Sequence, residues 1–503
     1  MEKVAIIEMN ENNIKLLILN VKAGGFYNVF DKIVENVKLG SSIASEGLIP
    51  SAKVNETLTV LKLFRKVCDT NKVEKVFAIA TSFVKEAKNQ KSFFDEIYNN
   101  TSFSFTILSM EEEIKTIYSG VINYIDVPKG VLIDIEPTRT YLVHYNRRTI
   151  LTIHTIDIGS STLADMFINM PQSAEKTKRM EQTFVEKLME IEFLKTLDPE
   201  TLFVGAGANI LSIAKLAKRA SHYPLEIDNN YVLKKEVFDA VLSKVESLDI
   251  DKVSKLKGIS EERADTLLGA MCILKALISY KNLQSLSVSS NGIEDGLIYN
   301  YVVPEINEKP LSDMLTYALD NIRLFYDKEL SNTQNVYNLA IILFKQLKVM
   351  HKLPRSYVKA LRIASSMYDC GTRVGFENHP AYSFEIIVNS KLNGIGHRDL
   401  LLAGFACKLQ NQDNISLAEW VKYKDILTEE DLDAVRKLGV IINLAASLDR
   451  SRTANVMDVC CDILGDSIIM KTIVKEDATF DIRQGMKIGP DFKRIFKKYL
   501  QII

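Results

Sequence analysis

The same succession of strands and helices is predicted twice in the N-terminal part of this chain, and the repeat strongly constrains the fold. Each cycle opens with apolar strands joined by a polar turn and continues with strands that alternate with helices. The strands of the first cycle are predicted at 4–9, 15–21, 73–81 and 105–108. Those of the second are predicted at 131–135, 139–145, 149–158 and 202–207. We therefore expect an α/β core made of two similar halves, with a ligand site between them.

Beyond residue 303 the pattern changes, and a chain of 503 residues is too long for a single core. Residues 310–465 have helical periodicity with little strand signal, which indicates an all-α domain. Near the end, 468–474 and 478–482 are predicted to form a hairpin and 492–500 a basic helix. The predicted boundaries are 1–125 for the first half, 126–303 for the second, 304–465 for the helical domain and 466–503 for the C-terminal hairpin and helix.

Charge and cysteine content exclude several classes of protein. Lys and Arg total 63 and Asp and Glu total 64, so the chain has no overall basic field to attract nucleic acid. No apolar run reaches the length of a membrane span, and the N-terminus begins as a strand rather than a signal peptide. The six cysteines include no Cys-x-x-Cys pair, which disfavours a zinc site. We expect a cytoplasmic protein with reduced thiols and with neither a nucleic-acid nor a membrane partner.

Carboxylates occur where rigid elements are predicted to begin or end. Glu111, Glu112 and Glu113 open a predicted helix, and Asp134 follows the apolar strand residues 131–133. Carboxylates that rigid elements bring to one site can bind Mg²⁺ and orient a water molecule for phosphoryl transfer. A structural role also stays open, because acids are favoured in the first turn of a helix and Asp134 could simply cap its strand. For Glu112, an exposed helical position is the better interpretation.

Four stretches resemble, in order, motifs of the exopolyphosphatase/guanosine-pentaphosphate phosphohydrolase (Ppx-GppA) family. ATSFVKEAKN at 80–89 is similar to A-T-S-A-x-R-x-A-x-N, and SMEEEIKTIYSGV at 109–121 is similar to S-G-x-E-E-A-R-L-I-x-x-G-V. GISEERAD at 258–265 resembles G-L-x-x-x-R-A-D, and SSNGIEDGLIY at 289–299 resembles S-x-x-G-x-R-E-G-L-L-Y. Because all four occur in the family's order, the chain is identified as a divergent member of that family.

The resemblance implies an actin/hexokinase-like (ribonuclease H-like) core of duplicated halves, an all-α HD-like domain and a small C-terminal α+β piece. It also implies Mg²⁺-assisted hydrolysis of a terminal phosphoanhydride in polyphosphate or guanosine pentaphosphate, with guanosine tetraphosphate as a related ligand, and a homodimer built through the helical domain. The family's catalytic base falls on Glu113 and its loop aspartate on Asp134, and both are expected at the metal. A family arginine falls on Lys85, which keeps the charge but not the planar fork.

The loops that hold phosphate in the family are altered in this chain. D-x-G-S-N-S appears as EMNENN at 8–13, which has lost the glycine and gained Glu11. D-I-G-G-G-S-T-E appears as DIEPTRTY at 134–141, where Pro137 lacks an N–H donor and Glu136 adds negative charge. Phosphate must approach bare backbone N–H groups, so each lost contact is expected to cost about 2–4 kcal/mol of transition-state stabilisation.

Other groups remain available to an anionic substrate. The third family loop, G-x-S-G-T, appears as GAGAN at 205–209, which is a milder change, whereas Glu294 replaces a family arginine. The predicted substrate-binding residues are Lys85, Arg139, Asn12, Gly205, Gly207 and Asn209. A further stretch, DIGSST at 157–162, looks like a phosphate loop, but its place in the order matches a strand-to-helix turn. We therefore expect no ligand contact there.

The HD-like run of the helical domain also departs from the family. A-A-x-L-H-D-x-G appears as ASSMYDCG at 364–371, so Tyr368 replaces the histidine, and Asp369 with His379 supplies too few ligands for a metal. Two hypotheses on function remain. The first is an active phosphohydrolase, in which Glu113 orients the attacking water and Asp134 holds Mg²⁺. The second is a catalytically inactive protein that binds a nucleotide or another partner as a regulator or scaffold. The retained carboxylates favour the first hypothesis, and the altered loops favour the second.

Overall fold

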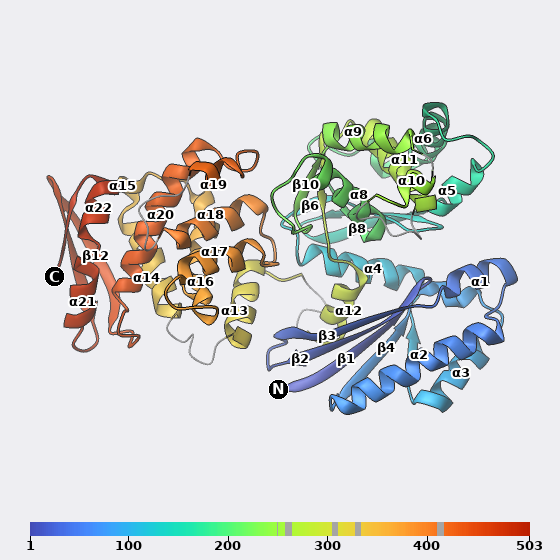
Figure 1. Cartoon of the computed structure of the whole chain (residues 1–503), viewed down its shortest axis with the longest axis horizontal. Helices are drawn as coiled ribbons and strands as arrows, with labels where there is room; N and C mark the ends of the chain where they lie inside the picture. Colours follow the sequence, from blue (N-terminus) through green and yellow to red (C-terminus); the bar gives the residue numbers. More distant parts are fainter. Residues whose placement is uncertain (249, 257–263, 304–309, 327–332, 410–416) are drawn as a thin grey trace. The chain divides into compact units, whose positions relative to one another are not determined.

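The computed structural model describes residues 1–248, 250–256, 264–303, 310–326, 333–409 and 417–503. The chain divides into two compact units, and both predicted halves of the core lie in the first of them (Figure 1). Unit 1 comprises Met1–Ser221 and Asp228–Met314, and unit 2 comprises His222–Ile227 and Leu315–Ile503. The boundaries expected at 125, 303 and 465 stay predictions. The family-like motif at 258–265 falls for the most part outside the described residues.

The first half of unit 1 is a five-stranded sheet with the order β3-β2-β1-β4-β5. Its strands are β1 (Glu2–Met9), β2 (Asn13–Val21), β3 (Tyr27–Asn36), β4 (Lys75–Ala80) and β5 (Phe105–Ile107). β1 pairs antiparallel with β2 and parallel with β4, and α1 (Leu39–Glu46) and α2 (Ser51–Thr70) precede β4 in the chain. The core of this half joins β1 and β2 to α2 and to α3 (Gln90–Thr101). β1 and β2 are buried at most positions, as expected for strands covered on both faces.

The second half repeats the topology of the first. Its six-stranded sheet has the order β10-β11-β9-β6-β7-β8. The strands are β6 (Lys129–Ile135), β7 (Thr140–Asn146), β8 (Thr149–Ile156), β9 (Leu202–Ala206), β10 (Tyr231–Lys234) and β11 (Ser285–Val288). β6 pairs antiparallel with β7 and parallel with β9, as β1 does with β2 and β4. The predicted duplication is therefore confirmed, with β10 as an addition at one edge.

The strand β3 of the first half was not predicted from the sequence. β3 pairs antiparallel with β2 and occupies the edge of its sheet. Most of its residues are exposed, and Val29, Phe30 and Val34 are exposed apolar side chains. A solvated edge strand lacks the alternation of apolar and polar residues that identifies a strand with one buried face.

The two halves of unit 1 meet through a close contact between two helices, α4 (Met110–Ile122) and α12 (Ile293–Tyr301). A Cβ added at Gly120 would lie 1.9 Å from the Gly292 carbonyl oxygen, and one at Gly296 would lie 1.9 Å from the Thr116 carbonyl oxygen. Both contacts are to backbone atoms, which cannot move aside by rotation. Glycine at these two positions is therefore what allows the helices to approach so closely.

Gly120→Ala is expected to destabilise unit 1 by about 2 kcal/mol or more, because the added methyl group forces the two backbones apart. Gly292→Ala is the matched control, since a Cβ at that position meets no atom within 4 Å. Denaturant titration followed by circular dichroism measures both changes. Equal midpoints for the two variants would show that the helix contact is looser than described.

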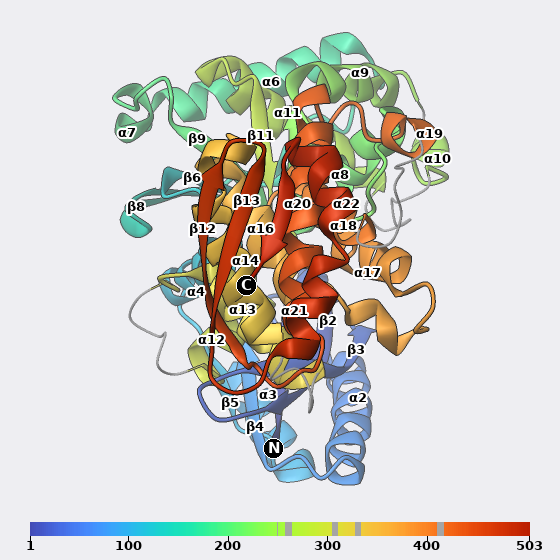
Figure 2. The same ribbon diagram turned by 90° about the vertical axis from the view of Figure 1, so that its left-hand side faces the viewer.

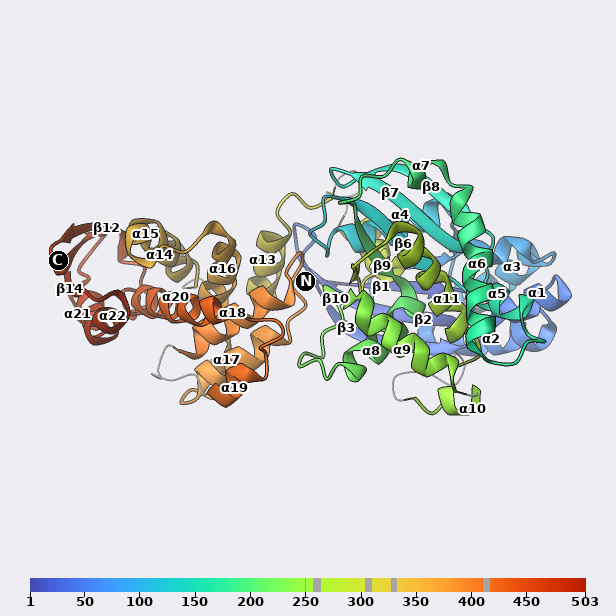
Figure 3. The ribbon, with the colours of Figure 1, turned by 90° about the horizontal axis from the view of Figure 1, so that it is seen from above.

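Unit 2 is a helical bundle joined to a three-stranded sheet. Its main helices are α13 (Met314–Tyr326), α14 (Thr333–Gln346), α16 (Val358–Met367), α17 (His379–Val388), α18 (His397–Lys408) and α20 (Glu429–Ser447). The sheet has the order β12-β13-β14, and Figure 2 shows α21 and α22 beside it. One continuous core runs from these helices into the sheet, and α20 packs against α14 and α18 within it (Figure 3).

The C-terminal segment differs from its prediction. The sheet consists of β12 (Val456–Leu464), β13 (Ser467–Val474) and β14 (Tyr499–Ile502), so the expected all-α region already ends at α20. Residues 478–482, predicted as a strand, belong largely to the helix α21 (Thr479–Met486), and the Thr479 N–H at its start donates to Asp477 Oδ1 at 2.9 Å. A five-residue segment such as ATFDI, with three apolar residues, is too short to distinguish a strand from a helical turn. The predicted helix at 492–500 ends early, because α22 (Gly489–Phe496) stops before β14.

Within the described ranges, no helix combines the length and the apolarity needed to cross a membrane. All six cysteines are free thiols, and three of them, Cys68, Cys272 and Cys407, are buried.

Candidate functional site

The three glutamates at the start of α4 have different roles. Glu112 forms a capping box with Ser109, in which each side chain accepts a hydrogen bond from the other residue's backbone N–H. Glu111 is exposed and pairs with Lys115 at 2.6 Å. Glu113 is half-buried, and its Oε2 accepts the backbone N–H of Ser82 at 2.8 Å. Of the three, Glu113 is therefore the carboxylate that faces the interior of unit 1.

Asp134 lies near the end of β6 and is only 3 % exposed. Its Oδ1 has no hydrogen-bond partner among the described residues. Gly207, the first residue of α8 (Gly207–Ala220), has φ +83°, and a Cβ there would lie 1.9 Å from this Oδ1. The sequence thus places glycine where any side chain would collide with the carboxylate. A buried, unsatisfied carboxylate oxygen is costly in an empty site, so it marks a place for a cation or a water molecule.

Burial and charge repulsion raise the pKa values of the carboxylates at this site. Burial and, to a lesser extent, the charge of Glu113 together raise the pKa of Asp134 to about 7. Burial also raises the pKa of Glu113, an effect that the hydrogen bond from Ser82 partly offsets. Glu11, from the altered first loop, has its pKa raised to about 7 by burial and by the charges of Glu113 and Glu86. Added positive charge would relieve all three carboxylates.

These raised pKa values predict a pH-dependent stability. The protonated Glu11 carboxyl is favoured in the folded state, so its contribution is fully present below pH 4.5 and is lost as the pH rises to about 7. Glu11→Gln is therefore expected to become more stable than the unsubstituted protein as the pH rises from 5 to 8, by at most about 3 kcal/mol. Unfolding free energies at several pH values measure the difference. The exposed variant Glu111→Gln should show no such trend, and a flat difference for Glu11→Gln would contradict the assignment.

The first loop satisfies its own backbone donors. The Asn10 side-chain oxygen accepts the N–H groups of Asn12 and Asn13 at 3.0 and 2.9 Å. The carbonyl of Asn12 accepts the N–H groups of Val37 and Lys38, and its side chain is exposed. Asn12, a predicted substrate-binding residue, thus has an exposed side chain, and its backbone N–H and carbonyl are both hydrogen-bonded within the protein.

Glu8, at the end of β1, is also paired. Lys15 Nζ lies 3.1 Å from its Oε2, and Asn10 Nδ2 donates to its Oε1 at 2.7 Å. Neither Lys15 nor Ser82 was identified from the sequence. The Glu8–Lys15 pair could have been found, because the two residues face each other in the β1–β2 hairpin.

The second loop is closed by hydrogen bonds to a neighbouring turn. Within it, the Glu136 N–H donates to the Arg139 carbonyl at 2.9 Å. The carbonyls of Glu136 and Pro137 accept the N–H groups of Ser160 and Ser161 at 2.9 and 2.8 Å. Those N–H groups belong to the start of α5 (Ser160–Met166), in the DIGSST stretch that looked like a phosphate loop. The loop at 134–141 and the turn at 157–162 are therefore hydrogen-bonded to each other, so the Ser160 and Ser161 N–H groups are already engaged within the protein.

The predicted cationic groups lie at the surface. Arg139 contacts Glu86 at 3.2 Å and Asp157 at 3.3 Å, so it links the two halves of unit 1 by an ion-pair bridge. Lys85 is exposed on the short 3₁₀ helix η1 (Ser82–Glu86). Glu294, which replaces a family arginine, pairs with Lys32 at 2.7 Å. Arg139 and Lys32 are thus both paired with acidic side chains. A polyanion would need to displace those acids in order to bind either cation.

The third loop contributes mainly to packing. Gly205 lies inside β9, where a Cβ would approach Leu286 and Ile210. Asn209 is 8 % exposed, and its Nδ2 donates to the Ile135 carbonyl at 2.7 Å and to Ser160 Oγ at 3.2 Å. Of the three residues predicted here, only Gly207 contacts a candidate catalytic group.

The carboxylates of this site could bind Mg²⁺ only if substrate phosphates and water supplied the remaining ligands. Across the chain as described, no group of three or more His, Cys, Asp or Glu side chains is arranged to hold a metal ion. Mg²⁺ commonly keeps several water molecules and binds through one or two carboxylates together with substrate phosphates. Asp134, with its unpartnered Oδ1, and Glu113 fit that limited role.

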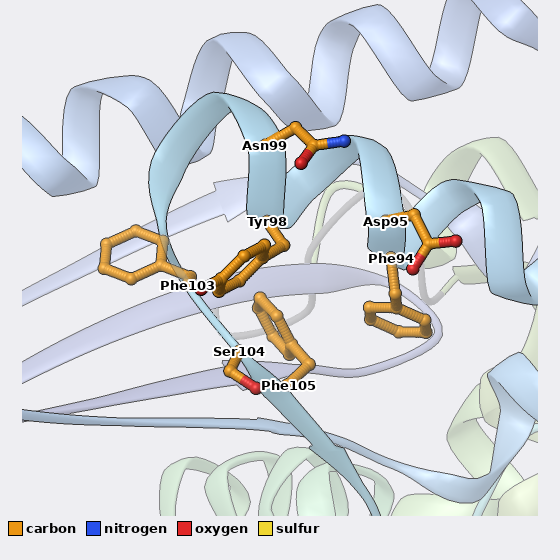
Figure 4. A pocket seen from close by; sticks show the side chains of 7 residues that line it. All are labelled: Phe94, Asp95, Tyr98, Asn99, Phe103, Ser104 and Phe105. Atoms are coloured by element: carbon orange, nitrogen blue, oxygen red, sulfur yellow. The ribbon is translucent and has the colours of Figure 1, made fainter.

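A separate surface cavity of about 360 Å³ contains none of the predicted site residues. It lies between α3 and the edge strand β5. Figure 4 shows the aromatic side chains of Phe94, Tyr98 and Phe105 around it, with Asp95 at its margin. The cavity is therefore distinct from the carboxylates at β6 and α4.

Known proteins resemble the chain both in sequence and in fold. A family model described as the Ppx/GppA phosphatase family matches residues 17–304. A guanosine-5'-triphosphate,3'-diphosphate pyrophosphatase of Pseudoalteromonas atlantica is 20 % identical over 473 residues, covering 92 % of this chain and 89 % of that protein. A bifunctional 3-dehydroquinate synthase/phosphatase of Fusobacterium nucleatum is 25 % identical over 302 residues. That match covers 57 % of this chain and 45 % of the relative, which is less than half of its length.

Solved structures share the fold of unit 1. The crystal structure of the Aquifex aeolicus member of the Ppx/GppA family aligns with a TM-score of 0.53 and 24 % identity, covering 60 % of this chain and 98 % of that one. An exopolyphosphatase from Cytophaga hutchinsonii aligns with a TM-score of 0.54 and 20 % identity, covering 60 % and 98 %. These likenesses confirm the actin-like α/β core. Together with the family match over more than half of its length, they place the chain in the Ppx/GppA phosphatase family.

Proposed function

We propose that the chain hydrolyses the terminal phosphoanhydride of polyphosphate or of guanosine pentaphosphate with the help of Mg²⁺. The observation that supports this most is the pair Glu113 and Asp134: both are shielded from solvent, α4 and β6 share one core, and the charge of Glu113 raises the pKa of Asp134. Two carboxylates in such an arrangement supply a base and a metal ligand. The guanosine pentaphosphate phosphohydrolase relatives agree with this choice of substrate class.

In this proposal each carboxylate has a separate task. Asp134 would hold Mg²⁺ through Oδ1, the oxygen without a partner in the described chain. When bound, the ion would offset the charge that develops on the phosphoryl group. Glu113, oriented by the Ser82 N–H, would position the attacking water and take its proton. Burial raises the pKa of Glu113, which is the direction that makes a carboxylate a stronger base.

Turnover is expected to be slow. The Glu136 N–H is used inside its own turn, Pro137 has none, and the Asn12 and Asn13 N–H groups bind the Asn10 side chain. Each missing phosphate contact would cost about 2–4 kcal/mol of transition-state stabilisation. The same observation favours a second candidate function, in which the chain binds a nucleotide or another partner without hydrolysing it.

Phosphate release distinguishes the two candidates. Medium-chain polyphosphate and guanosine pentaphosphate are each incubated with the full chain in Mg²⁺ or in EDTA, and calorimetry measures their binding in parallel. Release that requires Mg²⁺, even below about 0.1 per second, supports the hydrolase. Binding without release supports the regulator. Neither binding nor release would exclude both functions for these ligands.

A further inference from the structure

Unit 2 contains several buried polar atoms around the ends of α16, α17 and α20 that the proposed function does not use. Asp369 follows α16 with its side chain 13 % exposed, and its Oδ1 has no hydrogen-bond partner in the described ranges. The Nδ1 atom of His379, at the start of α17, is also buried without a hydrogen-bond partner in the described ranges. A third side chain, Ser366 on α16, is 8 % exposed and also has an unsatisfied hydroxyl. Unsatisfied buried groups are rare in folded proteins and call for a partner.

Asp449 adds a further buried carboxylate to this cluster. It follows α20, is 2 % exposed, and accepts the Ala454 N–H on Oδ1 at 2.8 Å. The side chain of Asn335 also interacts with this carboxyl and lowers its pKa, while Oδ2 makes no hydrogen bond of standard geometry in the part of the chain that the structure describes. Arg452 lies 3.6 Å from Asp369, and its charge lowers the pKa of Asp369 and of Asp449 against the larger effect of burial. Arg452 therefore contacts Asp369 directly and also acts on Asp449 through its charge.

Exposed arginines surround these buried acceptors. Arg452 has 48 % of its side chain exposed, and Arg373 and Arg450 are exposed as well. Burial lowers the pKa of His379 and the charge of Arg450 lowers it further, so Arg450 lies near the imidazole. Arg373 acts in the same way on Asp369. Arg450 makes no ion pair or hydrogen bond with any described residue, so its guanidinium is available to a ligand.

The arginines and the aspartates of this region favour different ligand groups. A matching ligand has an anionic group at one end and hydrogen-bond donors at the other. Guanidinium groups bind phosphate oxygens, often through two parallel hydrogen bonds. Ionised Asp oxygens accept hydrogen bonds but cannot donate them, so the buried part requires N–H or O–H donors. The positive charges of Arg373, Arg450 and Arg452 would repel a metal cation, so a metal ion is disfavoured here. A nucleoside phosphate combines both ends, with an anionic phosphate chain and a base that carries amino or imino donors.

We propose that unit 2 binds a nucleoside phosphate at this arginine–aspartate cluster, with the phosphates on Arg450 and Arg452 and the base donors on Asp369 and Asp449. The site lies within unit 2 and is independent of Glu113 and Asp134. Ligand bound there would leave the hydrolytic carboxylates free for substrate. The replacement of the family histidine by Tyr368 removes a metal ligand but leaves these acceptors in place.

Calorimetric titration of the full chain with GDP, ADP and sodium pyrophosphate tests the proposal. Arg450→Glu is expected to weaken nucleotide binding at least tenfold, because it places a negative charge beside the phosphates. Arg436→Glu is the matched control, since this exposed arginine on α20 undergoes the same charge change and should leave the affinity unchanged. Equal affinities in Arg450→Glu and the unsubstituted protein, or no nucleotide binding at all, would overturn the proposal.

A second variant tests the buried acceptors. Asp369→Asn is expected to weaken GDP or ADP binding at least fivefold and to leave pyrophosphate binding unchanged, because only the nucleotides carry base donors. Thermal unfolding of the variant checks that unit 2 remains folded. If Asp369→Asn binds nucleotides as tightly as the unsubstituted protein, or if pyrophosphate binds as tightly as the nucleotides, the assignment of the base to this cluster is wrong.

Discussion

Glu113→Gln is expected to lower Mg²⁺-dependent phosphate release by at least about 100-fold, the usual loss when a general base is removed. Glutamine has nearly the same shape and can still accept the Ser82 N–H through its amide oxygen. It cannot take a proton from the attacking water. The variant should therefore retain substrate binding and lose kcat, which initial-rate measurements across substrate concentrations would show.

Glu111→Gln provides the control for this experiment. Glu111 lies in the same first turn of α4, but its side chain is 69 % exposed and pairs only with Lys115. Its substitution should leave the rate within about twofold, as expected for a surface position. If both variants retained the rate of the unsubstituted protein, Glu113 would not be the base. If both lost it equally, the effect would come from the helix terminus instead.

Gly207→Ala is expected to destabilise unit 1 by about 3 kcal/mol or more, and to abolish any Mg²⁺-dependent activity. Alanine is strained at φ +83°, which costs about 1–2 kcal/mol. Its Cβ would also lie 1.9 Å from Asp134 Oδ1, which forces the buried carboxylate to move. Denaturant titration measures the loss of stability, and phosphate release measures the loss of activity.

A double-mutant cycle separates the two causes. In the Asp134→Ala background the carboxylate is absent, so Gly207→Ala should cost only the backbone strain of about 1–2 kcal/mol. The difference between the two backgrounds is then the energy of the collision between Gly207 and Asp134. Additive effects of the two substitutions would show that Gly207 does not position this carboxylate.

The sequence was sufficient for the duplicated layout of unit 1, for its central strands and for the family. Apolar runs at β1, β2, β6 and β7 are long and buried, so their periodicity reports the strands directly. The solvated edge strand β3 and the short helix α21 were not predicted, because neither has a pattern that distinguishes it from its alternatives.

The candidate site was predicted only in part. Glu113 and Asp134 were placed correctly at the start of a helix and the end of a strand. The assignment of Gly205 and Asn209 to substrate did not anticipate their surroundings, since Gly205 lies inside β9 and Asn209 binds the Ile135 carbonyl. Both residues belong to a loop with a small-residue pattern, which does not reveal whether its polar groups face a ligand or the protein.

The amino-acid sequence by itself determined the duplicated α/β core, the family and the positions of Glu113 at a helix start and Asp134 near a strand end, because these depend on local periodicity and on short motifs. Only the tertiary structure decided which backbone donors are already used. The carbonyls of Glu136 and Pro137 bind N–H groups more than 20 residues away, at Ser160 and Ser161. It also buried Glu11 and exposed it to the charge of Glu113, and both effects raise the pKa of Glu11. Hydrogen bonds and charge interactions of this kind join segments that are distant in the chain, and their partners cannot be read from local sequence.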